Sequence, residues 1–307
     1  MSIVISDLCK SYGLQKAIDN VSFQVANNEI TGFLGPNGAG KSTTMKIITG
    51  YIQADAGKVK VNDIDVSENP LGVKKKIGYL PEHNPLYPEM YIAEYLEFVA
   101  GIYKLRGNKS QRLKEVIELT GLTSERRKKI GQLSKGYRQR AGLAAALIHD
   151  PEVIILDEPT SGLDPNQIVE IREVIRRLGE NKTVLFSSHI LQEVESICDR
   201  VVIINKGKIV ADDTLPNLQG AKNYNHIIIL ELAAPHDAEE LEKIEGVLKT
   251  EQLSPTSFRL QTNDAEKVKK NLFSFSLSNH INIVSSQSEQ TSLENIFRNL
   301  TGNIQNN

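Results

Sequence analysis

The stretch GPNGAGKST, residues 35–43, constrains the fold of this 307-residue chain more than any other feature. It fits the phosphate-loop pattern G-x-x-x-x-G-K-[ST], and it lies between an apolar run, EITGFL (29–34), and a helix-like segment that Gly50 closes. The alternative is a glycine-rich turn before an ordinary helix. Because a strand, this loop and a helix follow one another in order, we favour a phosphate site within an α/β domain.

The residue types in this loop suit phosphate chemistry. Glycines let backbone N–H groups approach phosphate oxygens, and the helix that begins near Gly40 presents its positive end to them. We expect Lys41 to reach the β- and γ-phosphates and Ser42 to ligate Mg²⁺. The residues predicted to bind the nucleotide here are Gly35, Pro36, Asn37, Gly38, Ala39, Gly40, Lys41, Ser42 and Thr43.

Two adjacent carboxylates, Asp157 and Glu158, follow the apolar run VIIL (153–156). Such a short continuous run is typical of a parallel strand buried on both faces, and open α/β sheets bind ligands at the carboxyl ends of these strands. We expect Asp157 to hold Mg²⁺, directly or through water, and Glu158 to orient and polarise the attacking water. The alternative is a solvated strand end.

His189 follows a second apolar run that also reads as a buried strand, within KTVLFSSH (182–189). A lone histidine is most often a satisfied core or surface residue, but this one ends a sheet strand beside the predicted γ-phosphate. We therefore predict that His189 contacts the γ-phosphate and fixes the geometry of the water. Lys41, Glu158 and His189 are the predicted catalytic residues.

The pattern up to about residue 214 alternates strands with helices, which favours an α/β domain with a largely parallel sheet. Asp164 and Pro165 are a plausible N-cap and first residue of a helix over 163–180. Residues 200–213 read as two strands joined by a tight turn at Asn205-Lys206-Gly207.

The composition becomes polar over residues 215–225. Beyond this stretch the pattern reads strand, helix, strand, strand, helix, strand, which predicts a small ferredoxin-like α+β domain. A last helix is predicted over 292–300. The C-terminal part of the chain could be a sensing module or a module that stabilises a dimer.

Bulk properties exclude several classes of protein. A net charge of −2 and a pI of about 6.3 do not indicate nucleic-acid binding, which usually involves a basic domain. Two distant cysteines, Cys9 and Cys198, exclude a disulfide scaffold. The N-terminus lacks the regions of a signal peptide, and no apolar run approaches the roughly 20 residues that cross a bilayer. We expect a cytoplasmic chain that could still dock on a membrane protein.

The segment LSKGYRQR, residues 133–140, places several positive charges at the start of a predicted helix. These charges could contact a nucleic-acid backbone, form a solvated surface, or meet the phosphate of a smaller ligand. Ser134 is a good N-cap, and the helix behind it offers free N–H groups and a positive dipole end to an anion. The residues alone leave these alternatives open.

Five motifs in order, GPNGAGKST, LSKGYRQR, VIILDEP, SGLD and SSH, resemble the ATP-binding subunits of ABC transporters over about residues 1–215. The resemblance implies a P-loop ATPase cassette over residues 1–217 with a mixed sheet core, an N-terminal antiparallel β subdomain and a helical subdomain at about 84–150. We expect a linker over 218–225 and the accessory α+β domain over 226–307.

In this family the signature segment, usually LSGGQ, closes over ATP that is held by the phosphate loop of the other subunit. The resemblance therefore assigns Ser134, Lys135 and Gly136 to the γ-phosphate of ATP. Two departures stand out: Lys135 replaces the first signature glycine, and Tyr137 replaces the glutamine. The lysine could add charge beside the phosphate or point to solvent.

Three further site residues are implied by the resemblance. Tyr12 matches the aromatic on which adenine stacks, its alternative being an edge-strand tyrosine. Asp164 would couple the two ATP sites across the dimer, a role compatible with that of an N-cap. Glu82 stands where the family usually has a glutamine that ligates Mg²⁺ and links the site to the membrane partner. A carboxylate can ligate Mg²⁺, but it adds negative charge near ATP.

The implied function is ATP hydrolysis, with ATP and Mg²⁺ as cofactors, in a dimer with itself or with a paralogue. The dimer would drive a separate transmembrane permease, as an exporter by analogy, at the inner face of the cell membrane and without nucleic acid. An aromatic-rich segment, residues 85–103, carries Tyr87, Tyr91 and Tyr95 at helical spacing. It is expected to line a groove for a permease helix or to belong to the core.

The segment 85–103, the stretch LSKGYRQRAGL (133–143) and the C-terminal extension are most similar to the ATPase subunits associated with bacterial gliding motility. The alternative function is a soluble ABC-type ATPase that acts on ribosomes or DNA. Such relatives typically carry two cassettes or a long coiled-coil insertion, whereas this chain has one cassette and no heptad run.

Overall fold

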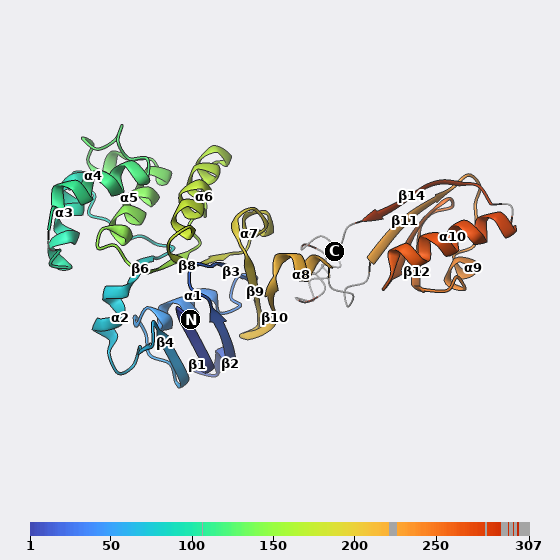
Figure 1. Ribbon diagram of the computed structural model, residues 1–307, viewed down its shortest axis with the longest axis horizontal. Helices are drawn as coiled ribbons and strands as arrows, with labels where there is room; N and C mark the ends of the chain where they lie inside the picture. The colour runs from blue at the N-terminus through green and yellow to red at the C-terminus, as the bar shows by residue number, and fades with distance from the viewer. Residues whose placement is uncertain are drawn as a thin grey trace. The chain divides into compact units, whose positions relative to one another are not determined.

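A computed structural model describes residues 1–105, 107–220, 226–279 and 281–289, together with positions 294, 297 and 300. The chain divides into two compact units, Met1–Thr214 and Leu215–Asn307 (Figure 1). Within the expected linker, residues 218–220 belong to helix α8 (Leu215–Gly220), and residues 221–225 lie outside the described part. The helix predicted over 292–300 also lies outside it, except at three positions.

The first unit contains two sheets, as the mixed-sheet cassette requires. The antiparallel sheet has the order β2-β1-β4-β5 and consists of β1 (Ile3–Tyr12), β2 (Gln15–Val25), β4 (Ala56–Val61) and β5 (Ile64–Asp65). The six-stranded sheet has the order β10-β9-β3-β8-β7-β6. Its strands are β3 (Ile30–Leu34), β6 (Ile77–Leu80), β7 (Val153–Asp157), β8 (Thr183–Ser188), β9 (Arg200–Asn205) and β10 (Lys208–Thr214). Only the β9–β10 pair is antiparallel in this sheet, which confirms the mixed core.

Continuous apolar runs explain the central strands. Every residue of β3, β7 and β8 is buried, as expected for strands covered on both faces. Helix α1 (Lys41–Ile48) contributes Met45 to one hydrophobic core shared by both sheets, in which the rings of Phe23 and Phe33 stack with centroids 5.2 Å apart. This packing fixes the start of α1 relative to the sheet.

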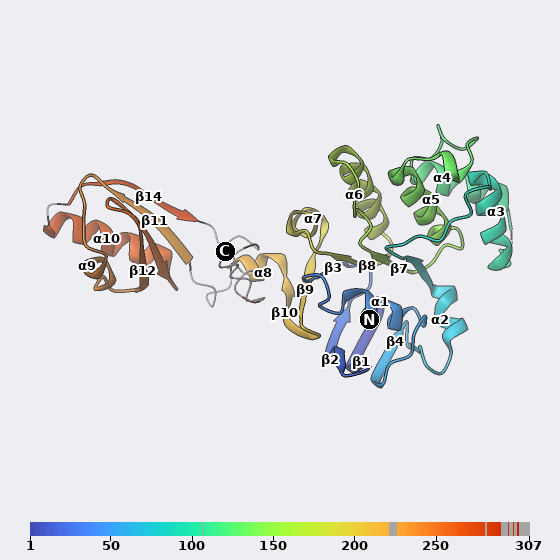
Figure 2. The same ribbon diagram turned by 180° about the vertical axis from the view of Figure 1, so that it is seen from behind.

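The other helices of the first unit are α2 (Pro70–Lys76), α3 (Ile92–Ile102), α4 (Lys109–Leu119), the 3₁₀ helix η1 (Ile130–Gln132), α5 (Lys135–Leu147), α6 (Pro165–Gly179) and α7 (Leu191–Ile197). Helices α3, α4 and α5 pack on one another as a helical group, away from the antiparallel sheet in both views (Figures 1 and 2). Because α3 begins only at Ile92, Tyr87 and Tyr91 precede the helix on which their spacing was expected to place them. Both are exposed, whereas Tyr95 is buried.

The second unit has the predicted order of elements: β11 (His226–Leu232), α9 (Ala238–Glu242), β12 (Val247–Ser254), β13 (Ser257–Thr262), α10 (Ala265–Asn279) and β14 (Ile283–Glu289). Its antiparallel sheet has the order β12-β13-β11-β14, which agrees with a ferredoxin-like arrangement. Phe258 and Leu260 on the sheet pack with Leu272 of α10 in a separate core. Across the described ranges, no helix is both long and apolar enough to span a membrane.

Candidate active site

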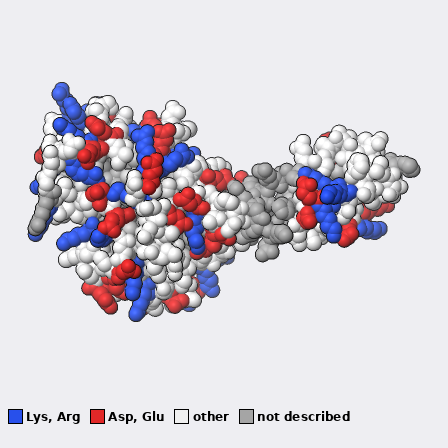
Figure 3. Space-filling model, in the orientation of Figure 1, with Lys and Arg blue, Asp and Glu red and all other residues white. Residues whose placement is uncertain are grey.

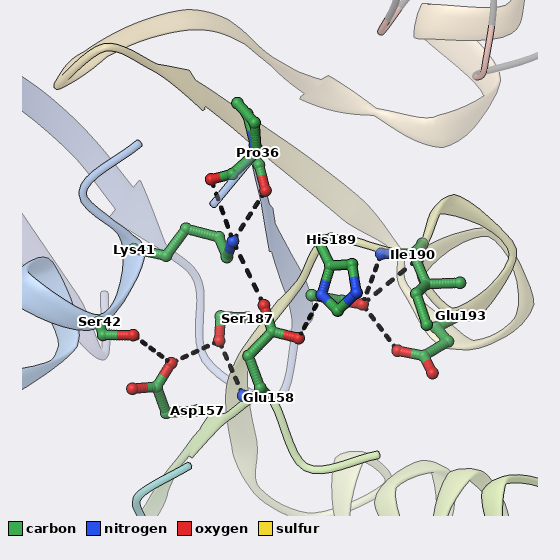
Figure 4. Close-up of polar contacts among 11 residues, drawn as sticks. Pro36, Lys41, Ser42, Asp157, Glu158, Ser187, His189, Ile190 and Glu193 are labelled. Atoms are coloured by element: carbon green, nitrogen blue, oxygen red, sulfur yellow. Dashed lines mark hydrogen bonds and ion pairs between the residues drawn. The ribbon is translucent and has the colours of Figure 1, made fainter. Parts of the chain in front are cut away.

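The parallel register brings the predicted catalytic residues to one edge of the six-stranded sheet. Asp157 at the end of β7 pairs with Ser187 of β8, and Leu34 at the end of β3 pairs with Ser188. The phosphate loop, the acidic pair and His189 follow these three strand ends. They therefore meet where an open α/β sheet binds its ligands (Figure 4).

The phosphate loop depends on glycine at two close approaches of the backbone. Gly40 has φ of 113°, and a Cβ there would lie 2.6 Å from the carbonyl oxygen of Ala17. A Cβ on Gly35 would collide with the carbonyl of Ile204. Gly40 directly precedes α1, so the free N–H groups at the start of this helix border the loop, as predicted.

Lys41 folds back over the phosphate loop and is only 6% exposed. Its Nζ donates to the carbonyl oxygen of Gly35 at 2.8 Å and to that of Pro36 at 3.4 Å. The same Nζ lies 3.2 Å from Oε1 of Glu158. An incoming phosphate would therefore compete with Glu158 for the lysine ammonium.

Glu158 connects Lys41 to His189, so the three predicted catalytic residues form one chain of contacts. Its Oε2 lies 2.8 Å from Nδ1 of His189. The Glu158 side chain is 8% exposed and that of His189 is 43% exposed, so the chain runs from the buried loop to the surface. The Glu158 backbone has φ of 50°, an uncommon conformation for a residue other than glycine.

Asp157 and Ser42 lie together beside this chain of contacts. Oδ1 of Asp157 accepts from the Ser42 hydroxyl at 3.0 Å and from the Ser187 hydroxyl at 2.7 Å. Burial raises the pKa of Asp157, these two hydrogen bonds oppose that rise, and the charges of Glu82 and Glu158 add to it. A bound cation would offset this excess of negative charge.

This pair of oxygen ligands fits Mg²⁺, which is usually held by one or two carboxylates together with substrate phosphates and water. A site made by the protein alone is not seen: across the described residues, no three His, Cys, Asp or Glu side chains gather to hold a metal. Phosphate oxygens and water would supply the remaining ligands.

Ser187 belongs to the site as well, although the sequence motifs predicted no role for it. Its hydroxyl donates to Asp157, and it accepts the backbone N–H of Glu158 at 2.9 Å, so one buried side chain holds both carboxylate residues in place. The available signal was a hydroxyl at the end of an otherwise apolar buried run. Its position opposite Asp157 depends on strand register.

A cavity of about 640 Å³ opens at this edge. Its lining includes predicted site residues that lie far apart in the sequence: Tyr12, Asn37, Gly38, Gly40, Lys41, Ser42, Thr43, Glu82, Glu158 and His189. Tyr12 is 54% exposed, as a stacking platform requires. The structure thus places Tyr12 and Glu82 beside the phosphate loop.

Glu82 and Ser42 also line a second cavity, of about 590 Å³, which Asp157 borders as well. Its far wall comes from the helical group and includes Tyr95, Val99 and Tyr103. We call the first cavity, beside the phosphate loop, the phosphate cavity, and the second, lined by Tyr95 and Tyr103, the aromatic cavity. Glu82 borders both.

The predicted signature residues do not line the phosphate cavity of their own chain. Ser134 caps α5 by accepting the N–H of Tyr137 at 3.3 Å, and Asp164 caps α6 by accepting that of Gln167 at 3.0 Å. Both N-cap predictions are confirmed. The starts of α5 and α6 are adjacent, because Gly136 packs directly against the side chain of Gln167.

Lys135, the departure from the signature pattern, is exposed, and its amino group lies against Gly162 in the loop before α6. Gly162 has φ of 68°, and a Cβ there would collide with this amino group. Within its own chain, Lys135 therefore contacts the SGLD loop.

Comparison with known families gives a match to the ABC transporter family over residues 18–161. A linearmycin resistance ATP-binding protein of Bacillus subtilis is 36% identical over 299 residues, which cover 95% of this chain and 96% of that protein. A bacitracin transport ATP-binding protein of Bacillus licheniformis is 39% identical over 71% of this chain and 72% of its own length.

Solved structures agree with these relatives. An ATP-binding subunit of an ABC transporter has a TM-score of 0.66 and 30% identity, over 71% of this chain and 92% of that one. A dimeric bacterial ABC transporter cassette has a TM-score of 0.64 and 26% identity, over 69% of this chain and 98% of that one. The same values hold for a post-hydrolysis dimer bound to ADP and phosphate.

Proposed function

Because this chain belongs to the ATP-binding subunits of ABC transporters, a family of ATPases that dimerise and work with transmembrane permeases, we propose that two copies close over ATP and drive a separate permease. A paralogue could replace one copy. The observation that carries the hydrolytic part is the continuous contact Lys41–Glu158–His189 beside the Ser42–Asp157 pair.

In the proposed mechanism Glu158 orients the attacking water and accepts its proton through a carboxylate oxygen. Since Nδ1 of His189 faces Glu158, Nε2 is the ring nitrogen that can reach the γ-phosphate. Lys41 exchanges Glu158 for the β- and γ-phosphates. Ser42 and Asp157 would hold Mg²⁺, with Glu82 as a further carboxylate beside it, and the ion would neutralise phosphate charge.

We propose that the signature residues act on the ATP of the opposite copy. Ser134, Lys135, Gly136 and Asp164 lie at the adjacent starts of α5 and α6, outside their own phosphate cavity. Two helix N-termini and a lysine form a surface suited to an anion. In this arrangement Lys135 links the SGLD loop to the trans γ-phosphate.

Tyr12→Ala is expected to weaken ATP binding about 2- to 12-fold, because stacking on an aromatic ring contributes about 0.5–1.5 kcal/mol. Fluorescence titration with a labelled ATP analogue measures this change. Tyr51→Ala, at an exposed tyrosine on the aromatic cavity, is the matched control and is expected to have no effect on affinity. Equal affinities for the two variants would contradict the assignment of Tyr12.

The aromatic cavity supports a permease contact at the inner face of the membrane. Its aromatic wall suits an amphipathic helix laid in a groove, and Glu82, which lines this cavity, also borders the ATP site. We propose export as the direction, which the relatives named for linearmycin resistance and bacitracin transport support. A role in gliding motility remains a prediction that rests on local sequence alone.

Affinity purification from detergent-solubilised native membranes tests the hypothesis that this chain binds a transmembrane permease. A Glu158→Gln chain is used with ATP to hold the closed form, and the same chain carrying Lys41→Met is the control. We expect a polytopic membrane protein to co-purify with the first and not with the second.

Recovery of ribosomal or DNA-bound partners alone would instead support the soluble ATPase alternative. Basic and acidic side chains are interspersed over the visible face of the cassette, which does not favour that outcome (Figure 3).

We further propose that the second unit stabilises the dimer. It has its own core and its own sheet, so removing residues 221–307 is expected to leave the melting temperature and ATP affinity of the cassette unchanged. The truncated chain should need a higher protein concentration to form the ATP-bound dimer in light scattering. The same concentration dependence with and without these residues would rule out this role.

A further inference from the structure

Glu193 is a buried acidic residue for which the mechanism above has no use. It is the third residue of α7 and is only 1% exposed. One carboxylate oxygen, Oε2, accepts from the Ser188 hydroxyl at 2.7 Å. The other, Oε1, is buried with no hydrogen-bond partner among the described residues. A buried and half-satisfied carboxylate is costly, so its presence calls for a physical reason.

The Ser188 hydroxyl passes this contact on to the backbone on the other side of His189. It accepts the N–H of Ile190 at 2.9 Å, and its own side chain is fully buried. Ser188 and Ile190 are the two neighbours of His189 in the chain. The Ser188 hydroxyl thus connects the backbone that follows His189 to the carboxylate of Glu193 (Figure 4).

This hydrogen bond supports the turn before α7, a helix that has no side-chain cap at its N-terminus. Its N-cap, Ile190, makes no side-chain capping bond, and no glycine or proline fixes the turn between β8 and α7. The His189 side chain itself is 43% exposed, so packing alone does not set its position. Glu193 anchors this turn to the buried side of α7.

We propose that Glu193 is a positioning residue for His189: through Ser188 it holds the turn that aims the imidazole at Glu158 and the γ-phosphate. Glu193 acts as a hydrogen-bond acceptor and does not touch the nucleotide. This inference rests on the proposed role of His189. Loss of the acceptor would displace the imidazole, and small displacements of catalytic groups reduce turnover much more than substrate binding.

Glu193→Met is expected to lower kcat about tenfold while changing the affinity for ATP less than twofold. Glu193→Gln keeps an acceptor oxygen for Ser188 and should retain most of the activity. The ring resonances of His189 in NMR spectra, assigned with His189→Ala, should shift in Glu193→Met and stay in place in Glu193→Gln. In the His189→Ala background, Glu193→Met should cause no further loss of kcat.

Val194→Ala is the matched structural control, since Val194 is fully buried in the same helix. If it lowers kcat as much as Glu193→Met at an equal melting temperature, the positioning role is wrong. Independent losses from the Glu193 and His189 substitutions would also overturn it. Should Glu193→Met fail to fold, Ser188→Ala removes the same hydrogen bond and must give the same loss and the same NMR shift.

Activity measurements on two variants distinguish the role of His189 from that of Glu193. Full activity in His189→Ala would remove the proposed role of the histidine, and this inference with it. An impaired His189→Ala chain beside a fully active Glu193→Met chain would remove the inference alone.

Discussion

Glu158→Gln is expected to abolish most ATP hydrolysis, with kcat falling about 10²- to 10⁴-fold, while ATP binds as tightly as before or more tightly. The amide has nearly the same shape as the carboxylate but cannot accept a proton from water. It also carries no charge, so it competes less with phosphate for Lys41, which lies 3.2 Å from Oε1. Phosphate release under single-turnover conditions and a binding titration measure the two effects.

Glu173→Gln is the control for this experiment, because Glu173 is an exposed carboxylate on α6 that lies outside the phosphate cavity. It should leave both quantities unchanged. Turnover in Glu158→Gln equal to that of the unmodified chain would refute the assignment of the base.

Lys41→Met has the second large expected effect, and it acts on binding and on stability together. Losing a charged donor to phosphate should weaken ATP binding about 10- to 100-fold. The substitution also leaves the Glu158 carboxylate, which is 8% exposed, without its ammonium partner. Breaking a buried ion pair from one side costs about 3–5 kcal/mol, so the free energy of unfolding should fall by up to that amount.

The double variant Lys41→Met/Glu158→Gln separates the two effects. Neutralising both partners should restore much of the lost stability in urea denaturation, while ATP binding stays weak. If the single and double variants unfold at the same urea concentration, the contact between Lys41 and Glu158 contributes nothing to the folded chain.

Motif spacing was enough to predict that the candidate site residues lie together at one edge of the sheet. GPNGAGKST, the acidic pair and His189 each follow an apolar run, and residues that follow buried parallel strands must meet at one sheet edge. The direct contact of Glu158 with Lys41 was not foreseen, because it depends on side-chain direction across a loop. The ferredoxin-like order of the second unit could be predicted because its strands and helices keep clean, separate periodicities.

The supporting residues could not be predicted, because their roles arise only from register and burial. Ser187 and Ser188 are ordinary hydroxyls in a strand until pairing places them beside Asp157 and before α7. Glu193 belongs to a polar-looking segment, LQEVES, that gives no sign of a fully buried carboxylate. The tyrosines at 87 and 91 show the opposite error, in which a helical spacing occurs where the chain is not yet helical.

The mass of the Glu158→Gln chain in solution, measured by light scattering with and without ATP, tests most directly whether two copies close over the nucleotide. We predict a species of 34.1 kDa alone and about twice that mass with ATP. Adding Ser134→Arg, at the signature N-cap outside its own phosphate cavity, should keep the mass at 34.1 kDa although ATP still binds. An unchanged mass with ATP, or full dimerisation despite Ser134→Arg, would contradict a site shared between two copies.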